Sequence, residues 1–222
     1  MRSLKYLFIR GFRPVRLIIS AAVTVAMLVL VMVFHENASS EDYLISKLCL
    51  NFGGILSVMI IEIFLCSELT GNRLLRSAPI SKEMRTFGIP MFSTLLGLGV
   101  SLVSIVPYSA FIAVSGLPAS HLSDTLIVSA ALMFLYIVMG TIAMNIRYGM
   151  ILLIYFYFPF GGLCFLISDE QWNNGFGIEL PLSVLIFVGT LIVSVAIAFA
   201  VSHIFYKKMD FKAYQQTMTA SM

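Results

Sequence analysis

Residues 1–34 read MRSLKYLFIRGFRPVRLIISAAVTVAMLVLVMVF, and this stretch decides what kind of protein the chain can be. Its first 16 positions hold five basic residues: Arg2, Lys5, Arg10, Arg13 and Arg16. The following residues, 17–34, contain no charged side chain. A helix needs about 20 apolar residues to cross the hydrocarbon core of a bilayer. The stretch therefore predicts a membrane-spanning helix with a basic anchor at its start.

The rest of the chain repeats this arrangement of long apolar segments separated by polar gaps. The predicted spans are residues 17–34, 44–67, 87–114, 125–145, 150–168 and 181–205. The 222 residues are 59% hydrophobic and 11% charged, whereas charged residues make up about a quarter of an ordinary soluble domain. We therefore expect one all-α transmembrane domain over residues 1–222, with six membrane-spanning helices.

The basic residues fall in alternate gaps between these spans. Thirteen of the 14 Lys and Arg residues lie before the first span or after the second, fourth and sixth, and only Lys47 lies inside a span. The other gaps hold acidic residues and no Lys or Arg. Loops that carry Lys and Arg stay on the cytosolic side of a membrane. The pattern predicts that both termini and the basic loop 68–86 are cytosolic.

Residues 1–16 are predicted to form an amphipathic helix that lies in the membrane interface. The apolar residues recur on roughly one face, and the basic residues lie away from it: Leu4, Phe8, Phe12 and Val15 against Arg2, Lys5, Arg10 and Arg13. The alternative is that these charges simply flank the first span. The Phe and Leu residues of the segment favour the interfacial helix, because they would serve little purpose in a merely flanking segment.

The second span carries the most polar side chains. One helix face holds residues that are three or four apart: Lys47, Asn51, Gly54, Val58 and Glu62. A charge within a membrane is costly and tends to face the bundle or a cavity. Asn51 and Glu62 are therefore candidates for a substrate pathway or an inter-subunit contact. The alternative is two charges near the interfaces, with Glu62 paired to Arg73 or Arg85.

The third and fifth spans carry helix-breaking residues. The third is long and contains Pro107, which predicts one kinked or tilted helix rather than two spans. The fifth contains an aromatic run followed by Pro-Gly-Gly, and Tyr155, Phe156 and Phe158 are its candidate pathway residues. This run forms an apolar substrate wall or a re-entrant element, or it is an ordinary set of lipid-facing or core aromatic residues.

Small residues follow one another at four-residue spacing in the sixth span: Thr190, Ser194, Ala198 and Ser202. Such a stripe lets another helix approach closely, so we expect a packing role for it. Cys49, Cys66 and Cys164 all lie within spans and are likewise expected to act as small packing residues.

Motifs for catalysis, metal binding or nucleotide binding are missing from the sequence. The three histidines, at 35, 121 and 203, form no HExxH spacing, and the chain contains no G-x-S-x-G elbow. No Walker sequence occurs in any predicted cytosolic segment. We therefore expect no catalytic residue, no metal site and no cofactor on this chain, and no nucleic-acid partner.

The most specific pattern is in the inner loop, where residues 71–83 read GNRLLRSAPISKE. Thr70 or Asn72 is suited to cap a short helix that Pro79 would end. Leu74 and Leu75 give this helix apolar side chains in a cytosolic setting, which indicates a protein partner or a resting place in the interface.

This loop resembles the one that leads into the third span of ABC-2 type transporter permeases, where the pattern L-x-S-L-P-I-S-R/K is common. The matching residues are Leu75, Ser77, Pro79, Ile80, Ser81 and Lys82, while Ala78 stands where the family usually has Leu. The predicted topology is similar over the whole chain. Its small size is most similar to permeases of Gram-positive exporters for peptides such as phenol-soluble modulins, lantibiotics and bacteriocins.

The resemblance implies an export permease in a bacterial cell membrane that moves amphipathic peptides or other hydrophobic compounds. It implies a second permease subunit, identical or different, and cytosolic ABC ATP-binding subunits that hold ATP and Mg. The inner loop would be the coupling helix that contacts the ATPase, with Arg73 and Arg76 on its surface and Leu74 and Leu75 in its groove. The residues so implied are Gly71, Asn72, Arg73, Leu74, Leu75, Arg76, Ser77 and Ala78.

Two other classes of protein are alternatives. A membrane-embedded protease or lipid-modifying transferase would need polar residues clustered at one depth, and Ser57, Glu62 and Cys66 are the best set that the sequence offers. A membrane sensor or assembly protein would have no ATPase partner. A neighbouring reading frame that encodes a Walker sequence would favour the permease.

Overall fold

The computed structural model describes residues 2–36, 54–66, 69, 81–116, 120–145 and 176–208, and this part of the chain contains helices and no strand. The all-helical class predicted from the sequence is confirmed for these residues. The elements are α1 (Arg2–Gly11), α2 (Pro14–Glu36), α5 (Ser81–Glu83), the π-helical turn η1 (Met84–Gly88), α6 (Ile89–Ser115), α7 (Ser120–Asn145) and α9 (Leu180–Lys208). A further apolar helix, Gly54–Cys66, lies between α2 and α5 in the sequence.

Three of the described helices are long and apolar enough to cross a membrane: Met84–Val114, Ser120–Asn145 and Leu180–Tyr206. They coincide with the third, fourth and sixth predicted spans. The first predicted span, 17–34, lies within α2, and the Gly54–Cys66 helix lies within the second. The fifth predicted span, 150–168, lies outside the described residues. The long apolar helices identify the chain as a membrane protein.

The third segment forms one helix, as predicted. α6 continues through Pro107 and ends at Gly116, whose φ of 67° is left-handed and whose N–H binds the carbonyl of Ile112. Glycine takes this conformation at little cost and so ends many helices. The structure also shows the π-helical turn η1 at the start of this segment, which the sequence analysis did not predict.

The helix that contains the fourth predicted span begins five residues before that span, whose predicted start is residue 125. α7 begins at Ser120, and the polar residues Ser123 and Asp124 lie inside the helix with almost no exposed surface. Hydropathy placed them in a loop. The protein instead satisfies their polar groups with the backbone that precedes α9, as described below.

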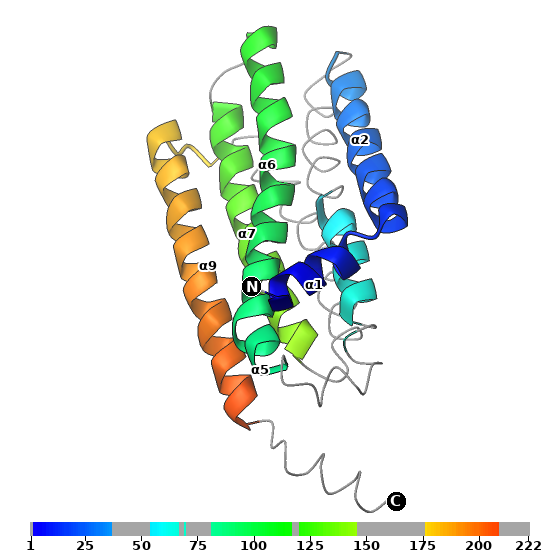
Figure 1. Ribbon diagram of the computed structural model, residues 1–222. Helices are drawn as coiled ribbons and strands as arrows, with labels where there is room; N and C mark the ends of the chain where they lie inside the picture. Colours follow the sequence, from blue (N-terminus) through cyan, green and yellow to red (C-terminus); the bar gives the residue numbers. More distant parts are fainter. Residues whose placement is uncertain are drawn as a thin grey trace, which may run out of the picture.

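The bundle is built around α6 and α7, which lie side by side between α9 on one flank and the Gly54–Cys66 helix and α2 on the other (Figure 1). α7 is the most buried of the three long helices. In its most apolar stretch 67% of the residues are buried, against 11% in that of α9. One apolar cluster joins α1, the Gly54–Cys66 helix, α6 and α7, and a second joins α6, α7 and α9. Most of the apolar surface of α2 and α9 faces outward, as suits helices in contact with lipid.

Candidate functional site

The polar face of the second predicted span points into the bundle. A Cβ at Gly54 would lie 3.4 Å from the hydroxyl of Tyr136 on α7 and 3.4 Å from Val100 on α6. Val58 and Glu62, one and two turns further along, are fully buried. The shared face predicted from the sequence is therefore an internal contact with α6 and α7 over its described part.

Glu62 lies directly against the backbone of α7 at Gly140. A methyl group at position 140 would lie 2.6 Å from Cδ and 3.0 Å from Oε2 of Glu62, and would also overlap Oε1. The carboxyl group thus fills the space that a side chain at position 140 would occupy. A fully buried carboxyl in a membrane helix is costly and marks a functional candidate. The sequence pointed to Glu62 but gave no signal for its neighbour, because Gly140 has no polar group.

Ser57 faces α2, away from Glu62. Its hydroxyl is 2.8 Å from that of Thr24 and donates to the carbonyl of Ser20 at 3.2 Å. Positions 57 and 62 are five residues apart, which is about 140° around a helix. The cluster of polar residues that an intramembrane enzyme would need is therefore not formed by these two residues.

The N-terminal helix predicted for residues 1–16 is present as α1, which lies across the bundle beside α6 (Figure 1). Its innermost residues are Ser3, Leu7 and Gly11, four residues apart, and Ser3 and Leu7 are fully buried. A Cβ at Gly11 would lie 2.7 Å from the ring of Phe92 on α6, so glycine permits this close approach. The face that docks on the bundle is therefore adjacent to the predicted apolar face.

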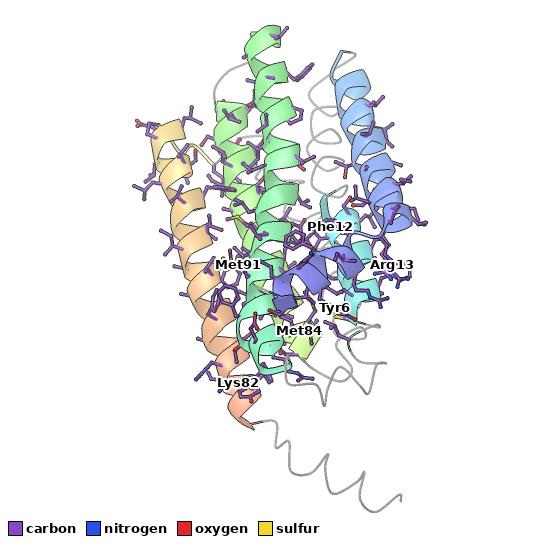
Figure 2. The ribbon with its side chains drawn as sticks, in the orientation of Figure 1. Tyr6, Phe12, Arg13, Lys82, Met84 and Met91 are labelled. Carbon is purple, nitrogen blue, oxygen red and sulfur yellow. The ribbon has the colours of Figure 1, made fainter. Side chains whose placement is uncertain are left out.

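The predicted apolar face of α1 contributes to an aromatic cluster. Phe8 and Phe12 stack with ring centroids 5.4 Å apart, and Phe92 lies 5.5 Å and 5.8 Å from them. Figure 2 shows Phe12 on the upper side of α1 and Tyr6 on its lower side. Val15 was predicted on the same face but is 67% exposed, because it lies beyond Pro14 and so belongs to α2.

α1 is also attached to the segment that follows the predicted coupling loop. The hydroxyl of Ser3 donates to Oε1 of Glu83 at 2.8 Å. The pKa of the Glu83 carboxyl is held below its usual range. The main cause is a hydrogen bond from the N-terminal ammonium group, and the next is the hydrogen bond from Ser3. A Cβ at Gly88 would lie 3.2 Å from Leu7 and 3.3 Å from Ser3, so α1 rests closely on η1 as well.

Arg16 joins α1, α2 and the second predicted span. Its Nη1 donates to the carbonyl of Arg10 at 2.8 Å, near the end of α1, and its guanidinium lies 4.8 Å from the ring centroid of Phe64. The side chain is largely buried. The sequence analysis treated Arg16 as one of the basic anchors, and the structure shows that it is also a packing residue.

At the opposite end of the bundle, α7 holds the segment that leads into α9. The carboxylate of Asp124 accepts a hydrogen bond from the backbone N–H of Phe176 at 3.0 Å, and the hydroxyl of Ser123 donates to the carbonyl of Ile178 at 2.6 Å. These bonds satisfy buried polar groups and fix the position at which α9 begins.

We expect the Asp124→Ala variant to be less stable than the wild type by about 1–3 kcal/mol, because it leaves the Phe176 N–H without its acceptor. Asp124→Asn keeps an acceptor oxygen and should retain most of the stability. Thermal unfolding in detergent, followed by circular dichroism, measures both. Equal losses in the two variants would show that the charge of Asp124, rather than its hydrogen bond, stabilises this end of the bundle.

The remaining predicted site residues lie outside the described part of the chain. They are Gly71, Asn72, Arg73, Leu74, Leu75, Arg76, Ser77 and Ala78 of the coupling loop, together with Asn51, Tyr155, Phe156 and Phe158. Across the described ranges, no three His, Cys, Asp or Glu side chains come together as a metal site.

Comparison of this chain with protein-family models, with curated proteins and with solved structures finds no match. An assignment of function therefore depends on the sequence pattern of the chain and on the architecture of its helices.

Proposed function

We propose that this chain is the membrane-spanning permease subunit of an ATP-driven ABC exporter of the ABC-2 type. It works in a bacterial cell membrane with a second permease subunit and cytosolic ABC ATP-binding subunits. ATP and Mg belong to those partners, so the chain itself is not an enzyme. The cargo that best suits its apolar and aromatic spans is an amphipathic peptide or another hydrophobic compound.

One observation carries this proposal: the R-L-L-R-S-A-P-I-S-K-E pattern of residues 73–83 leads directly into a long apolar helix. The described end of the pattern, Ser81–Glu83, is α5, which continues through η1 into α6. A loop that leads directly into a membrane helix is suited to transmit a movement of a cytosolic partner to the bundle, because a rigid helix carries the displacement along its length.

The position of α1 supports the same assignment. α1 has basic residues, no acidic residue and an aromatic side, as expected for a helix in the inner interface. It contacts both η1 and α6. A cytosolic partner that binds the inner loop would therefore lie next to the connection between α5 and α6, which α1 contacts from one side. Within the proposal, Glu62 and its neighbours on the Gly54–Cys66 helix are the part of the pathway wall that packs against α7.

Recovery of an ATPase with the purified chain tests the proposal. We expect the wild-type chain, solubilised in detergent from its native host, to bring down a nucleotide-binding ATPase. Leu74→Asp/Leu75→Asp should reduce the recovery about tenfold or more, since full burial of a leucine side chain is worth about 1.5–3 kcal/mol and about 1.4 kcal/mol is tenfold in affinity.

A matched control places the same two charges elsewhere on the predicted cytosolic side. Tyr214→Asp/Met218→Asp in the C-terminal segment should leave the recovery of the ATPase unchanged. If no ATPase is recovered with the wild type, even after cross-linking in intact membranes, the permease proposal is wrong. If the control and the loop variant lose the ATPase equally, the loop is not the contact site.

A further inference from the structure

The turn between α5 and α6 has an unusual register. Residues Met84–Gly88 form a π-helical turn, in which the N–H of Ile89 binds the carbonyl of Met84, five residues earlier. The hydroxyl of Thr86 donates a further hydrogen bond to the carbonyl of Lys82 at 2.8 Å. Such turns hold one residue more than an α-helical turn and occur frequently at functional sites.

Contacts from outside this segment favour the wide turn. α1 reaches it at both ends, through Ser3 with Glu83 on one side and through Ser3 and Leu7 with Gly88 on the other. On the opposite flank, Phe87 lies 6.0 Å from Phe199 of α9, measured between ring centroids. The turn is thus held between α1 and α9, two elements that are remote from it in the sequence.

We propose that α1 holds residues 84–88 in the π-helical register, and that release of α1 lets this turn rewind as α-helix and rotates α5 about the axis of α6. When the same residues are wound as α-helix, the preceding segment is displaced by the equivalent of one further residue, which is a rotation of about 100° with a rise of about 1.5 Å. A helix with its side chains is about 10–12 Å across, so a side chain on α5 would move by roughly 8 Å.

In this register change, a small displacement of α1 produces a large movement at the end of the inner loop. Breaking the bond between Ser3 and Glu83 requires a displacement of about an ångström, while the side chain of Lys82 moves several times further. That this movement is driven by an ATPase rests on the proposed function. The register change itself is a property of the chain alone.

Distances between two spin labels test the register change in the isolated chain, in lipid nanodiscs without nucleotide or partner. The labels go on Lys82→Cys and on Ile192→Cys of α9, which is exposed, after replacement of the native cysteines Cys49, Cys66 and Cys164 by alanine. Deletion of Thr86 removes the extra residue, so that an α-helical turn joins α5 to α6 with Lys82 in its wild-type orientation, and this variant supplies the reference distance for the unrotated position. Circular dichroism checks that each variant is folded.

Two substitutions should raise a second population, whose distance differs from the reference distance. Ser3→Ala removes the bond to Glu83, and Gly88→Ala presses on Leu7 and Ser3. Loss of one hydrogen bond should change the ratio of the two populations by about fivefold. Gly99→Ala is the matched control, because a Cβ there meets nothing within 4 Å.

The proposal is overturned if both variants keep the wild-type distance distribution, or if Ser3→Ala raises the second population equally in the chain that lacks Thr86. If the deletion variant does not fold, a second population shared by Ser3→Ala and Gly88→Ala supports the proposal, and its absence from both overturns it. Because no ATPase is present, either result leaves the permease assignment to its own test.

Discussion

Gly140→Ala is expected to destabilise the wild-type chain and to stabilise a chain in which Glu62 has already been replaced by alanine. In the wild type, the new methyl group would overlap the Glu62 carboxyl, whose Cδ is 2.6 Å from that position. Extra atoms forced into a packed interior cost about 1–3 kcal/mol. With alanine at position 62 the space is open, and alanine is then more favourable than glycine in a helix by about 0.5–1 kcal/mol.

A double-mutant cycle measures this coupling. The free energies of unfolding of the wild type, Glu62→Ala, Gly140→Ala and the double variant come from titration with sodium dodecyl sulfate in mixed micelles. Gly189→Ala on α9 is the control for helix propensity, since a Cβ there meets nothing within 4 Å. The effect of Gly140→Ala should change sign between the two backgrounds. An equal loss of stability in both would show that contacts other than the one with Glu62 oppose the methyl group at position 140.

The sequence predicted those features of the fold that depend on apolar length and on charge. The third, fourth and sixth spans are present as continuous helices, and α1 is present where basic and apolar residues alternate. Of the four small residues of the predicted stripe, Ser194, Ala198 and Ser202 are fully buried on α9, which packs on α7, and Thr190 is half-buried. These features can be predicted because each depends on a periodicity within one short stretch of sequence, whichever helix packs against it.

Other features depend on contacts between remote residues and left no local signal. Gly140 and Gly88 are ordinary glycines in the sequence, and only the positions of Glu62 and of α1 give them a role. The helix α7 extends over the polar residues Ser123 and Asp124, whose side chains bond the backbone at 176 and 178, and hydropathy carries no signal for these bonds.

The candidate site also contains residues that a local sequence signal identifies and contacts that only the structure shows. Glu62 could be selected from the sequence because intramembrane acids are rare, and the structure adds what it contacts. The coupling residues and Asn51, Tyr155, Phe156 and Phe158 rest on the sequence pattern and on the resemblance. The resemblance to ABC-2 permeases rests on the inner loop, and the pull-down of an ATPase is the measurement that tests it.

The second large effect is expected on α9, on the face of small residues that packs against α7. Ala198 is fully buried between Ser194 and Ser202, which lie one turn to either side and are also fully buried. Asn145 of α7 donates to the hydroxyl of Ser202 at 3.2 Å and to the carbonyl of Thr141 at 2.9 Å. Small side chains let helix backbones approach in a membrane, where lipid supplies no hydrophobic drive for association.

Ala198→Leu should therefore lower the free energy of unfolding by about 1–3 kcal/mol, because its added carbon atoms must separate α9 from α7 or distort both. Ala196→Leu introduces the same side chain two residues away, on the exposed side of α9, and should change stability little. Both variants are compared with the wild type by detergent titration of unfolding. If Ala196→Leu is the more damaging substitution, then the outward side of α9 is the one that binds protein, and the face that α9 turns to α7 contributes less to stability than its burial implies.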